Sequence, residues 1–492
     1  MDRKMIGSLI FALLGFIVIF MQPFSGSGLI PLGHQILGTV IIALGLWVFR
    51  PGNVPLLAGG SVILFGSMAI LTYHMKAKTM LAGADVPLIA NNGVVFGTAA
   101  NGFVSTAVWI LIPALYFGFV LQKTGLGKRL AYLVLKSFNP SWVTMALSWF
   151  IIGVLLSALT PSITVRIAIV IPIAISIVEA CKLEYRSKGA AFVTLLAWGM
   201  CIFPGTGWLT GSLSGPIMLG FLPMDMKEFA TNANWLKILG PPWMLVTFIF
   251  TILAYFFAKP SQPIGISVEI FREEYKTLGP MTRNETIALV TLVSCLILFF
   301  SESTHGIPSQ AVAMGALFIF IMTGIIEAPE LNTGINWDVV MFFGVAIGLS
   351  QLFRFTQVTA WFEPLVTPTI TNLATSPVTL MLFLTVVLLL IRFVDVPWGF
   401  TSIALFASVT SFLFTDFGYH PLVITMAFLI TINFFLLQYQ QPWMLMADGM
   451  IQGRGWAPNH VLLFGAIYLV AAFVALLAAI PYWKAIGVLG GG

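Results

Sequence analysis

The segment Leu159-Thr160-Pro161-Ser162-Ile163-Thr164 is a polar break within the apolar run 141–181. A second break, Asp395-Val396-Pro397-Trp398-Gly399, interrupts the apolar run 377–415. A membrane helix that stops halfway leaves backbone groups unpaired in hydrocarbon, which is tolerated only where they line a protein cavity. Two such breaks in matching halves of a chain are typical of the binding site of a transporter.

The composition predicts an all-α polytopic membrane protein. Of the 492 residues, 59% are hydrophobic and 8% are charged, whereas roughly a quarter of a soluble chain is charged. The net charge of +5 is scattered between apolar runs, so no nucleic-acid partner is expected. We expect about 11 transmembrane helices plus two re-entrant hairpins. The crossings are expected near 5–22, 29–49, 54–73, 103–121, 190–222, 240–258, 285–301, 308–326, 337–353, 422–450 and 460–480.

Flanking charges give the expected orientation. The run 141–181 is basic on both sides, and basic loops stay in the cytoplasm, so this run is predicted to enter and return on the cytoplasmic side. The basic residues are Lys123, Lys128, Arg129 and Lys136 before it, and Lys182, Arg186 and Lys188 after it. The second hairpin opens from the other face, where only Arg354 precedes it. We therefore expect a multi-pass protein of the cell (inner) membrane, with the N-terminus cytoplasmic and the C-terminus extracytoplasmic.

The two halves resemble each other, which predicts an inverted repeat. Each hairpin is followed by a crossing with a polar break, Phe203-Pro204-Gly205-Thr206-Gly207 in the first half and Gln438-Tyr439-Gln440-Gln441-Pro442 in the second. We call these the first and second broken crossings. The predicted organisation is a scaffold of N-terminal transmembrane helices (1–102), a first repeat core with the cytoplasmic-side hairpin (103–258), a cytoplasmic linker (259–284) and a second repeat with the outer-side hairpin (285–492).

From about residue 103 onward the chain resembles the divalent anion/sodium symporter family, whose members carry dicarboxylates, citrate or sulfate. The first tip, Thr160-Pro161-Ser162-Ile163-Thr164-Val165-Arg166, is close to the Thr-Pro-Ser-Asn-Thr-Ala-Arg form of the family's exchanger-rich branch. Gly205-Thr206-Gly207-Trp208-Leu209-Thr210-Gly211-Ser212 resembles its first broken crossing, and Gly279-Pro280-Met281-Thr282-Arg283 its linker. The chain departs from the pattern where Ile163 replaces the tip asparagine and where the second tip reads Trp398-Gly399-Phe400.

The resemblance implies a homodimer with elevator-type motion, sodium held by tip and loop, and substrate carboxylates between the halves. The implied sodium ligands are Ser157, Ser162, Gly205 and Gly207; sodium is the only cofactor-like group expected. The expected substrate-binding residues are Ser162, Ile163, Thr164, Arg166, Thr206, Trp398, Gly399, Thr401, Tyr439, Gln440 and Gln441.

Two charged positions have competing interpretations. A guanidinium such as that of Arg166 matches a carboxylate bidentately, but it could instead pair with an acidic residue across the bundle. Arg392 and Asp395 lie one helical turn apart and are expected to form a mutual salt bridge; the alternative is that Asp395 couples transport to protons. Ser162 and Thr164 could likewise cap a helix rather than bind a ligand.

The second half offers amide, phenol and aromatic groups at its breaks. Tyr439, Gln440 and Gln441 could recognise a polar ligand, or the glutamine run could be solvated. Trp398 could stack on an organic substrate, although aromatic residues in membrane helices are more often core.

The function predicted from these features is secondary active transport of small organic anions of the di- or tricarboxylate class, cation-coupled and elevator-type. The alternatives are a sodium-independent exchanger or a proton-coupled transporter of another polar substrate, and, with less support, a channel or ion antiporter. An enzyme is not expected, because the sequence offers no Ser-His pairing, no HExxH and no paired acidic residues for general acid/base chemistry.

Overall fold

The computed structural model describes the chain except for residues 1–2, 50, 52–54, 80–88, 396–397 and 490–492. In the described part every regular element is a helix, and 12 helices are long and apolar enough to cross a membrane. The all-α, polytopic prediction is therefore confirmed. These spans are Lys4–Met21, Pro31–Phe49, Leu56–Lys76, Thr106–Lys123, Trp142–Leu159, Ile163–Ala180, Lys188–Thr206, Asn232–Ala258, Arg283–Phe300, Trp337–Phe355, Phe400–Phe417 and Pro458–Ala485.

Several expected crossings differ from single long helices. The apolar run 308–326 forms a shorter helix, α16 (Ser309–Met322). The first broken crossing is divided into α9 (Lys188–Met200), α10 (Phe203–Thr206) and α11 (Ser214–Phe221). The second comprises α23 (Pro421–Asn433), η4 (Gln438–Gln440) and α24 (Pro442–Met450). Both breaks therefore fall where the sequence predicts them.

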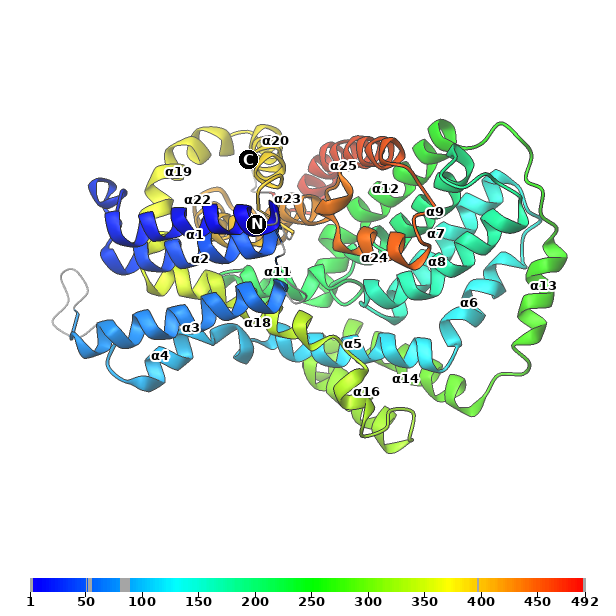
Figure 1. Cartoon of the computed structure of the whole chain (residues 1–492), viewed down its shortest axis with the longest axis horizontal. Coiled ribbons are helices and arrows are strands. Elements are labelled where there is room, and N and C mark those ends of the chain that lie inside the picture. The colour runs from blue at the N-terminus through cyan, green and yellow to red at the C-terminus, as the bar shows by residue number, and fades with distance from the viewer. Residues whose placement is uncertain (1–2, 50, 52–54, 80–88, 396–397, 490–492) are drawn as a thin grey trace. The chain divides into compact units, whose positions relative to one another are not determined.

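The chain folds into two compact units, the first formed by Met1–Trp109, Ile217–Glu228 and Asn336–Ile424. In it α1 packs on α2 and α2 on α3, while α18 contacts α3, α19 and α21 (Figure 1). Its elements are α1 (Arg3–Met21), η1 (Ser25–Ser27), α2 (Pro31–Phe49), α3 (Pro55–Lys76), α4 (Asn92–Ala99), η2 (Asn101–Val104), most of α11, most of η3 (Met224–Phe229), α18 (Trp337–Phe355), α19 (Val358–Ala374), α20 (Pro377–Ile391), α21 (Phe400–Phe406) and α22 (Val409–Phe417).

The second unit consists of Ile110–Pro216, Phe229–Ile335 and Thr425–Gly492. Here α12 packs along α25, and α9 lies against α7, α8 and α12 (Figure 1). Besides α9, α10, α16 and α24 it contains most of α5 (Thr106–Lys123), then α6 (Leu126–Leu135), α7 (Trp142–Leu159), α8 (Ile163–Ala180), α12 (Asn232–Ala258), α13 (Val268–Thr277), α14 (Arg283–Phe300), α15 (Glu302–His305), α17 (Glu330–Thr333) and α25 (Pro458–Ala485).

The two predicted hairpins are formed differently. The first is a pair of 18-residue helices, α7 and α8. Each is about 27 Å long at 1.5 Å per residue, a length that suits a tilted hairpin as well as a full crossing, so re-entry stays a prediction. The second hairpin has one helix, α20, on its first side and two shorter helices, α21 and α22, on its second.

Helices that the sequence did not predict lie between the apolar runs. The interval between 353 and 377 contains α19, whose Pro364 and Pro368 and several threonines give it a low apolar content. The basic flank after 123 contains the amphipathic α6, and the linker contains α13. Polar, proline-bearing helices lack the long apolar run on which the sequence assignment depended.

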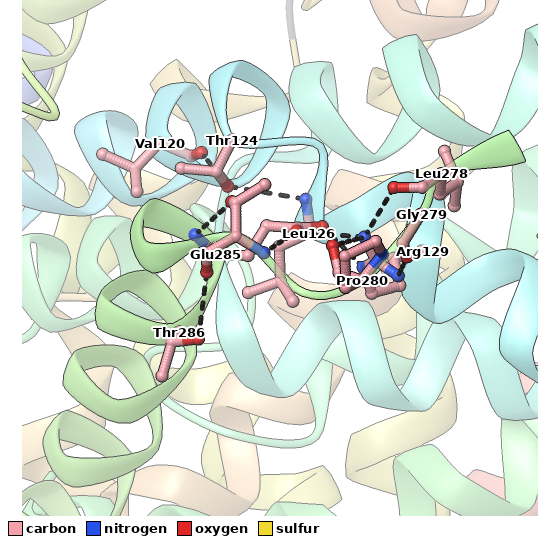
Figure 2. Close-up of polar contacts among 10 residues, drawn as sticks. Val120, Thr124, Leu126, Arg129, Leu278, Gly279, Pro280, Glu285 and Thr286 are labelled. Atoms are coloured by element: carbon pink, nitrogen blue, oxygen red, sulfur yellow. Dashed lines mark hydrogen bonds and ion pairs between the residues drawn. The ribbon is translucent and has the colours of Figure 1, made fainter.

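A buried ion pair fastens the linker to α6, as Figure 2 shows. Arg129 Nε donates to Glu285 Oε1 at 2.6 Å and Arg129 Nη2 to Glu285 Oε2 at 3.0 Å. The same guanidinium donates to the main-chain oxygens of Leu278, Gly279 and Pro280 at 2.9 to 3.3 Å. Glu285 also closes the capping box at the start of α14. We call this group the linker clasp.

Candidate functional site

The first break lies in the second unit and is a tight turn between two helices. The Thr160 backbone is extended where α7 ends, and α8 begins at Ile163. Ser162 caps α8, because its Oγ accepts a hydrogen bond from the Val165 backbone N–H at 3.4 Å. Ile163 is fully buried, whereas Thr164 is exposed. Capping therefore accounts for Ser162 locally, and of the predicted tip residues only Thr164 presents its side chain to the surface.

Arg166 is fully buried one turn into α8. Its Nη1 donates to the carbonyl oxygens of Gly211, at 2.7 Å, and Thr160, at 3.2 Å. In the part of the chain that the structure describes, its Nε and Nη2 have no hydrogen-bond partner, and no carboxylate lies within ion-pair distance. The acidic partner of the structural alternative is thus not found among these residues. Two donors of a buried cation remain available.

Gly205 and Gly211 let the first broken crossing approach this guanidinium. A Cβ atom at Gly205 would lie 2.7 Å from Arg166 Nη1 and 2.0 Å from the Gly211 oxygen, closer than side-chain carbons come to such atoms. Only glycine fits there, because the backbone itself occupies the space of a side chain. The unwound segment thus supplies a carbonyl to Arg166 without pushing it away.

The first and second broken crossings are tied to each other inside the second unit. Asn433, the last residue of α23, donates from Nδ2 to Thr206 Oγ1 at 3.2 Å. Thr206 is buried, and its carbonyl accepts from Trp235 Nε1 at 3.2 Å. The Asn433 Oδ1 atom is buried and has no partner among the described residues. Sequence reasoning missed Asn433; the available signal was a single amide at the end of the apolar run 421–432.

The glutamines of the second broken crossing hold its backbone. Gln440 Oε1 accepts from the backbone N–H groups of Leu436 and Leu437 at 2.8 and 2.9 Å. Gln441 Nε2 donates to the carbonyl oxygens of Ile432 and Phe434 at 2.8 and 3.1 Å. Unwound backbone inside a membrane protein needs such partners. Both amides therefore have a structural task, while Tyr439 is exposed.

Aromatic side chains pack around both broken crossings. Phe203 of α10 stacks on Tyr468 of α25 with ring centroids 4.9 Å apart, and Trp198 meets Phe435 edge-on at 5.0 Å. The Tyr468 hydroxyl donates to the Ile430 carbonyl at 2.9 Å. Aromatic packing of this kind fixes irregular backbone that has few hydrogen bonds of its own.

Space at the Arg166 donors is closed in this conformation. The gap bounded by Arg166, Trp149 and Cys201 has no room for a water molecule. An anion could reach the two free donors only after α8 and its neighbours separate.

Of the predicted sodium ligands, Ser157 carries the clearest unsatisfied oxygen. Its hydroxyl is fully buried on α7 and has no partner among the described residues. Gly205 and Gly207 contribute main-chain oxygens on either side of Thr206. Hydroxyl and carbonyl oxygens are the ligands that hard cations prefer, so the donor chemistry fits sodium.

The second tip belongs to the first unit, and Val396 and Pro397 lie outside the described residues. Trp398 and Gly399 both adopt left-handed backbone conformations, with φ of 60° and 74°. The Trp398 ring stacks on Phe400 and Phe343 with centroids 5.4 and 6.0 Å away. The indole therefore packs within an aromatic cluster in this structure. Thr401 is buried beside it, and its hydroxyl has no partner among the described residues.

Asp395 is bound by Ser402 rather than by Arg392 alone. The Asp395 carboxylate accepts from the Ser402 backbone N–H at 2.7 Å and from the Ser402 hydroxyl. Arg392 Nη1 reaches the main-chain oxygen of Asp395 at 3.3 Å. The contact shown between the two predicted partners thus runs through the backbone, and Ser402 is a carboxylate partner that the sequence reasoning did not single out.

Comparison with known proteins agrees with this architecture. The family described as the sodium:sulfate symporter transmembrane region matches residues 3–489. A Cupriavidus necator protein named only as a membrane protein is 23% identical over 94% of this chain and 89% of its own length. The L-tartrate/succinate antiporter of Escherichia coli K12 is 23% identical over 70% of each chain.

Two further similarities are more limited. The chloroplastic dicarboxylate transporter 1 of Spinacia oleracea is 24% identical over 70% of this chain, and the match spans 61% of that transporter's length. The crystal structure of the Alcanivorax borkumensis YdaH transporter superposes with a TM-score of 0.56 and 13% identity, covering 89% of this chain and all of that one. It supports the fold alone. Because the family match extends over nearly the whole sequence, this chain belongs to the sodium:sulfate symporter transmembrane family, whose members are transporters and not enzymes.

Proposed function

We propose that the chain is a secondary active transporter of small organic anions of the di- or tricarboxylate class in the cell (inner) membrane. Two relatives are named as a dicarboxylate transporter and as an L-tartrate/succinate antiporter, and both names support a dicarboxylate substrate. We further propose that transport is cation-coupled, that it follows an elevator-type mechanism, and that the protein is a homodimer.

The observation that carries the proposal is the incomplete bonding of Arg166. A buried guanidinium that lacks partners for two of its nitrogen atoms is costly to keep. Its free Nε and one Nη form the edge that binds a carboxylate with two parallel hydrogen bonds. An anion that enters would accept hydrogen bonds from these donors, and this would offset the free-energy cost of their burial.

Sodium is the proposed coupling ion. Ser157 Oγ, the Ser162 backbone and the carbonyl oxygens of Gly205 and Gly207 would supply the oxygen ligands. A cation near these residues would offset the second charge of a dicarboxylate, for which Arg166 alone supplies one compensating charge. Sodium and substrate would then bind cooperatively.

Sodium-independent exchange is the second candidate, and the burial of Ile163 favours it. A fully buried isoleucine stands where the family motif has an amide, which removes one oxygen ligand from the first tip. A related antiporter is a further reason to test exchange. Proton coupling through Asp395 is a third candidate: the burial of this carboxylate favours its protonated form, whereas the two hydrogen bonds from Ser402 favour the charged one.

The test is ligand-dependent thermal stabilisation of the purified protein followed by uptake into proteoliposomes. Succinate, malate, L-tartrate, 2-oxoglutarate, citrate and sulfate would each be added in sodium or in choline buffer. A ligand at 100 times its Kd stabilises the native state by about 2.7 kcal/mol. We expect a dicarboxylate to stabilise the protein, and Arg166→Gln to remove both that stabilisation and uptake.

The control is Arg272→Gln, which removes an exposed arginine from α13 and should leave stability, uptake and anion selectivity unchanged. Stabilisation that needs sodium supports coupling, and stabilisation in choline supports exchange. Wild-type uptake by Arg166→Gln would contradict the carboxylate-binding role.

A further inference from the structure

A small basic pocket lies in the first unit, where Gly220 and Phe221 at the end of α11 form part of its wall. Lys227 of η3 and Arg354 at the end of α18 line it, together with the polar side chains of Asn101, Ser350, Gln351 and Ser408. Its volume is about 30 Å³, room for about two water molecules, which matches the two oxygen atoms of one carboxylate group. We call this the outer basic pocket.

Lys227 and Arg354 form no ion pair with a described residue. Burial and the neighbouring charge of Arg354 lower the pKa of Lys227, as expected for two like charges that face one space. Arg354 is exposed and Lys227 half-buried, so an ion in solution can reach them.

One acidic residue, Glu363 of α19, faces the same region. Burial raises the pKa of its carboxyl, while the charge of Arg354 and a hydrogen bond from Ser408 oppose that rise. Lys227, Arg354 and an ionised Glu363 together leave one net positive charge among these three described residues. A singly charged carboxylate group would therefore be attracted to it, and a sulfate more strongly.

The predicted topology places the positive charge of this pocket on the extracytoplasmic face. Arg354 precedes the hairpin that is predicted to open from the extracytoplasmic face, and basic residues on that face run against the usual bias toward cytoplasmic lysine and arginine. Two of them on separate segments converge here. One wall of the pocket is formed by Ala404 of α21 and by Ser408, which precedes α22, so the second hairpin takes part in it.

We propose that the outer basic pocket is a separate, low-affinity anion site that captures one carboxylate or sulfate group at the extracytoplasmic face. The inference rests on the proposed anion transport, because a capture site serves a substrate that must then cross. Positive potential at the mouth of a pathway raises the local concentration of an anion and its rate of association. The site would act before the anion reaches Arg166.

A cysteine placed in the pocket tests this without any transport assay. The half-buried Ser350 makes no side-chain hydrogen bond to a described residue that its replacement would break. Ser350→Cys, in a Cys181→Ser background, would be treated in detergent with an anionic or a cationic methanethiosulfonate reagent and scored by mass spectrometry. We expect the anionic reagent to react about tenfold faster at low salt, and 0.5 M salt to remove most of that preference.

Three comparisons test whether Lys227 and Arg354 cause the preference for the anionic reagent. Lys227→Gln with Arg354→Gln should bring the two rates together, whereas Arg354→Lys should keep the preference. Arg272→Gln with Lys276→Gln, which removes two charges from α13, is the matched control and should change nothing. Size-exclusion profiles would establish that each variant is folded.

Protection of the introduced cysteine by an added anion distinguishes binding in the pocket from general electrostatic attraction of the reagent. Millimolar succinate or sulfate should slow modification of Ser350→Cys several-fold, and the double substitution at Lys227 and Arg354 should abolish that protection. Equal rates for both reagents, a preference without protection, or protection that survives the double substitution would each overturn the proposal. The labelling rate at Ser350→Cys does not depend on transport. Normal uptake by Arg166→Gln would therefore contradict the proposed substrate site at Arg166 but not the outer basic pocket.

Discussion

The burial of Arg166 and the number of its hydrogen bonds indicate whether the residue serves stability or ligand binding. It is fully buried and donates to the two carbonyls of Thr160 and Gly211. A residue retained for stability would use more of its five donors, as Arg129 does in the linker clasp. Under-used donors are a cost to folding that a ligand can recover.

We therefore predict that Arg166→Met is inactive but loses no more than about 1 kcal/mol of unfolding free energy. The substitution removes the cost of burying a charge that has no ion-pair partner among the described residues, and this gain offsets the loss of the hydrogen bonds to Thr160 and Gly211. Denaturation of the purified protein without ligand, beside uptake, measures both quantities. A loss of 3–5 kcal/mol, the usual cost of breaking a satisfied buried pair, would instead mean that Arg166 is structural.

Ile163 offers a second substitution with opposed effects on stability and coupling. Ile163→Asn should lower the melting temperature in choline, because it removes buried apolar surface and adds an amide without a partner. Sodium should restore part of that stability if the new amide oxygen reaches the ion. Ile163→Val is the control for lost volume; an equal response of both variants to sodium would exclude a cation role for this position.

At the scale of the helices, the linker clasp joins α6 to the start of α14. In the sequence the segment between them is recognisable only as charged and proline-containing. Arg129 and Glu285 are both buried, and the guanidinium gathers three consecutive carbonyls of the linker. These bonds fix the backbone between the end of α13 and the start of α14 (Figure 2).

Arg129→Met should destabilise the protein by about 3–5 kcal/mol, since it strands the Glu285 carboxylate. Arg129→Met combined with Glu285→Leu should be less destabilised than Arg129→Met alone, because no buried charge remains. A double-mutant cycle from chemical denaturation measures the coupling. The exposed Arg272–Glu269 pair on α13 is the matched control, and its removal should have no measurable effect. Additive effects at Arg129 and Glu285 would contradict the clasp.

Element positions could be predicted from apolar runs because each buried helix needs one. The breaks at 160–162, 201–213 and 434–441 were recognisable for the converse reason: proline, glycine and amides interrupt such runs. What could not be predicted is which groups bond across the chain. Asn433 meeting Thr206, Ser402 meeting Asp395 and the main-chain roles of Gln440 and Gln441 depend on tertiary placement, which no local pattern carries.

For the whole protein, the predicted orientation can be tested with the native cysteines. Cys201 and Cys295 are buried, while Cys181 at the end of α8 is half-buried. An impermeant thiol reagent should therefore modify Cys181 alone, and only from the face predicted to be cytoplasmic. Inside-out and right-side-out vesicles distinguish the faces, with Cys181→Ser as the blank. Modification from the outside would reverse the predicted topology.

The same labelling should depend steeply on pH. Burial raises the pKa of the Cys181 thiol to about 11, and the thiolate is the reactive form. Below that pKa the thiolate fraction grows about tenfold per pH unit, so the rate should rise about a hundredfold from pH 7.5 to 9.5. A rate that levels off near pH 8.5 would indicate an unperturbed thiol.

The hydrogen bond between Asn433 and Thr206 has a consequence for biosynthesis. Its two residues are 227 positions apart in the chain, which at 5–20 residues per second corresponds to about 10–45 s of translation. Throughout that interval the first broken crossing is already made, while the Asn433 amide that binds its Thr206 hydroxyl is not. An arrested nascent chain that ends before Asn433 should therefore be recognised by membrane proteases, and one that extends past α25 should be spared.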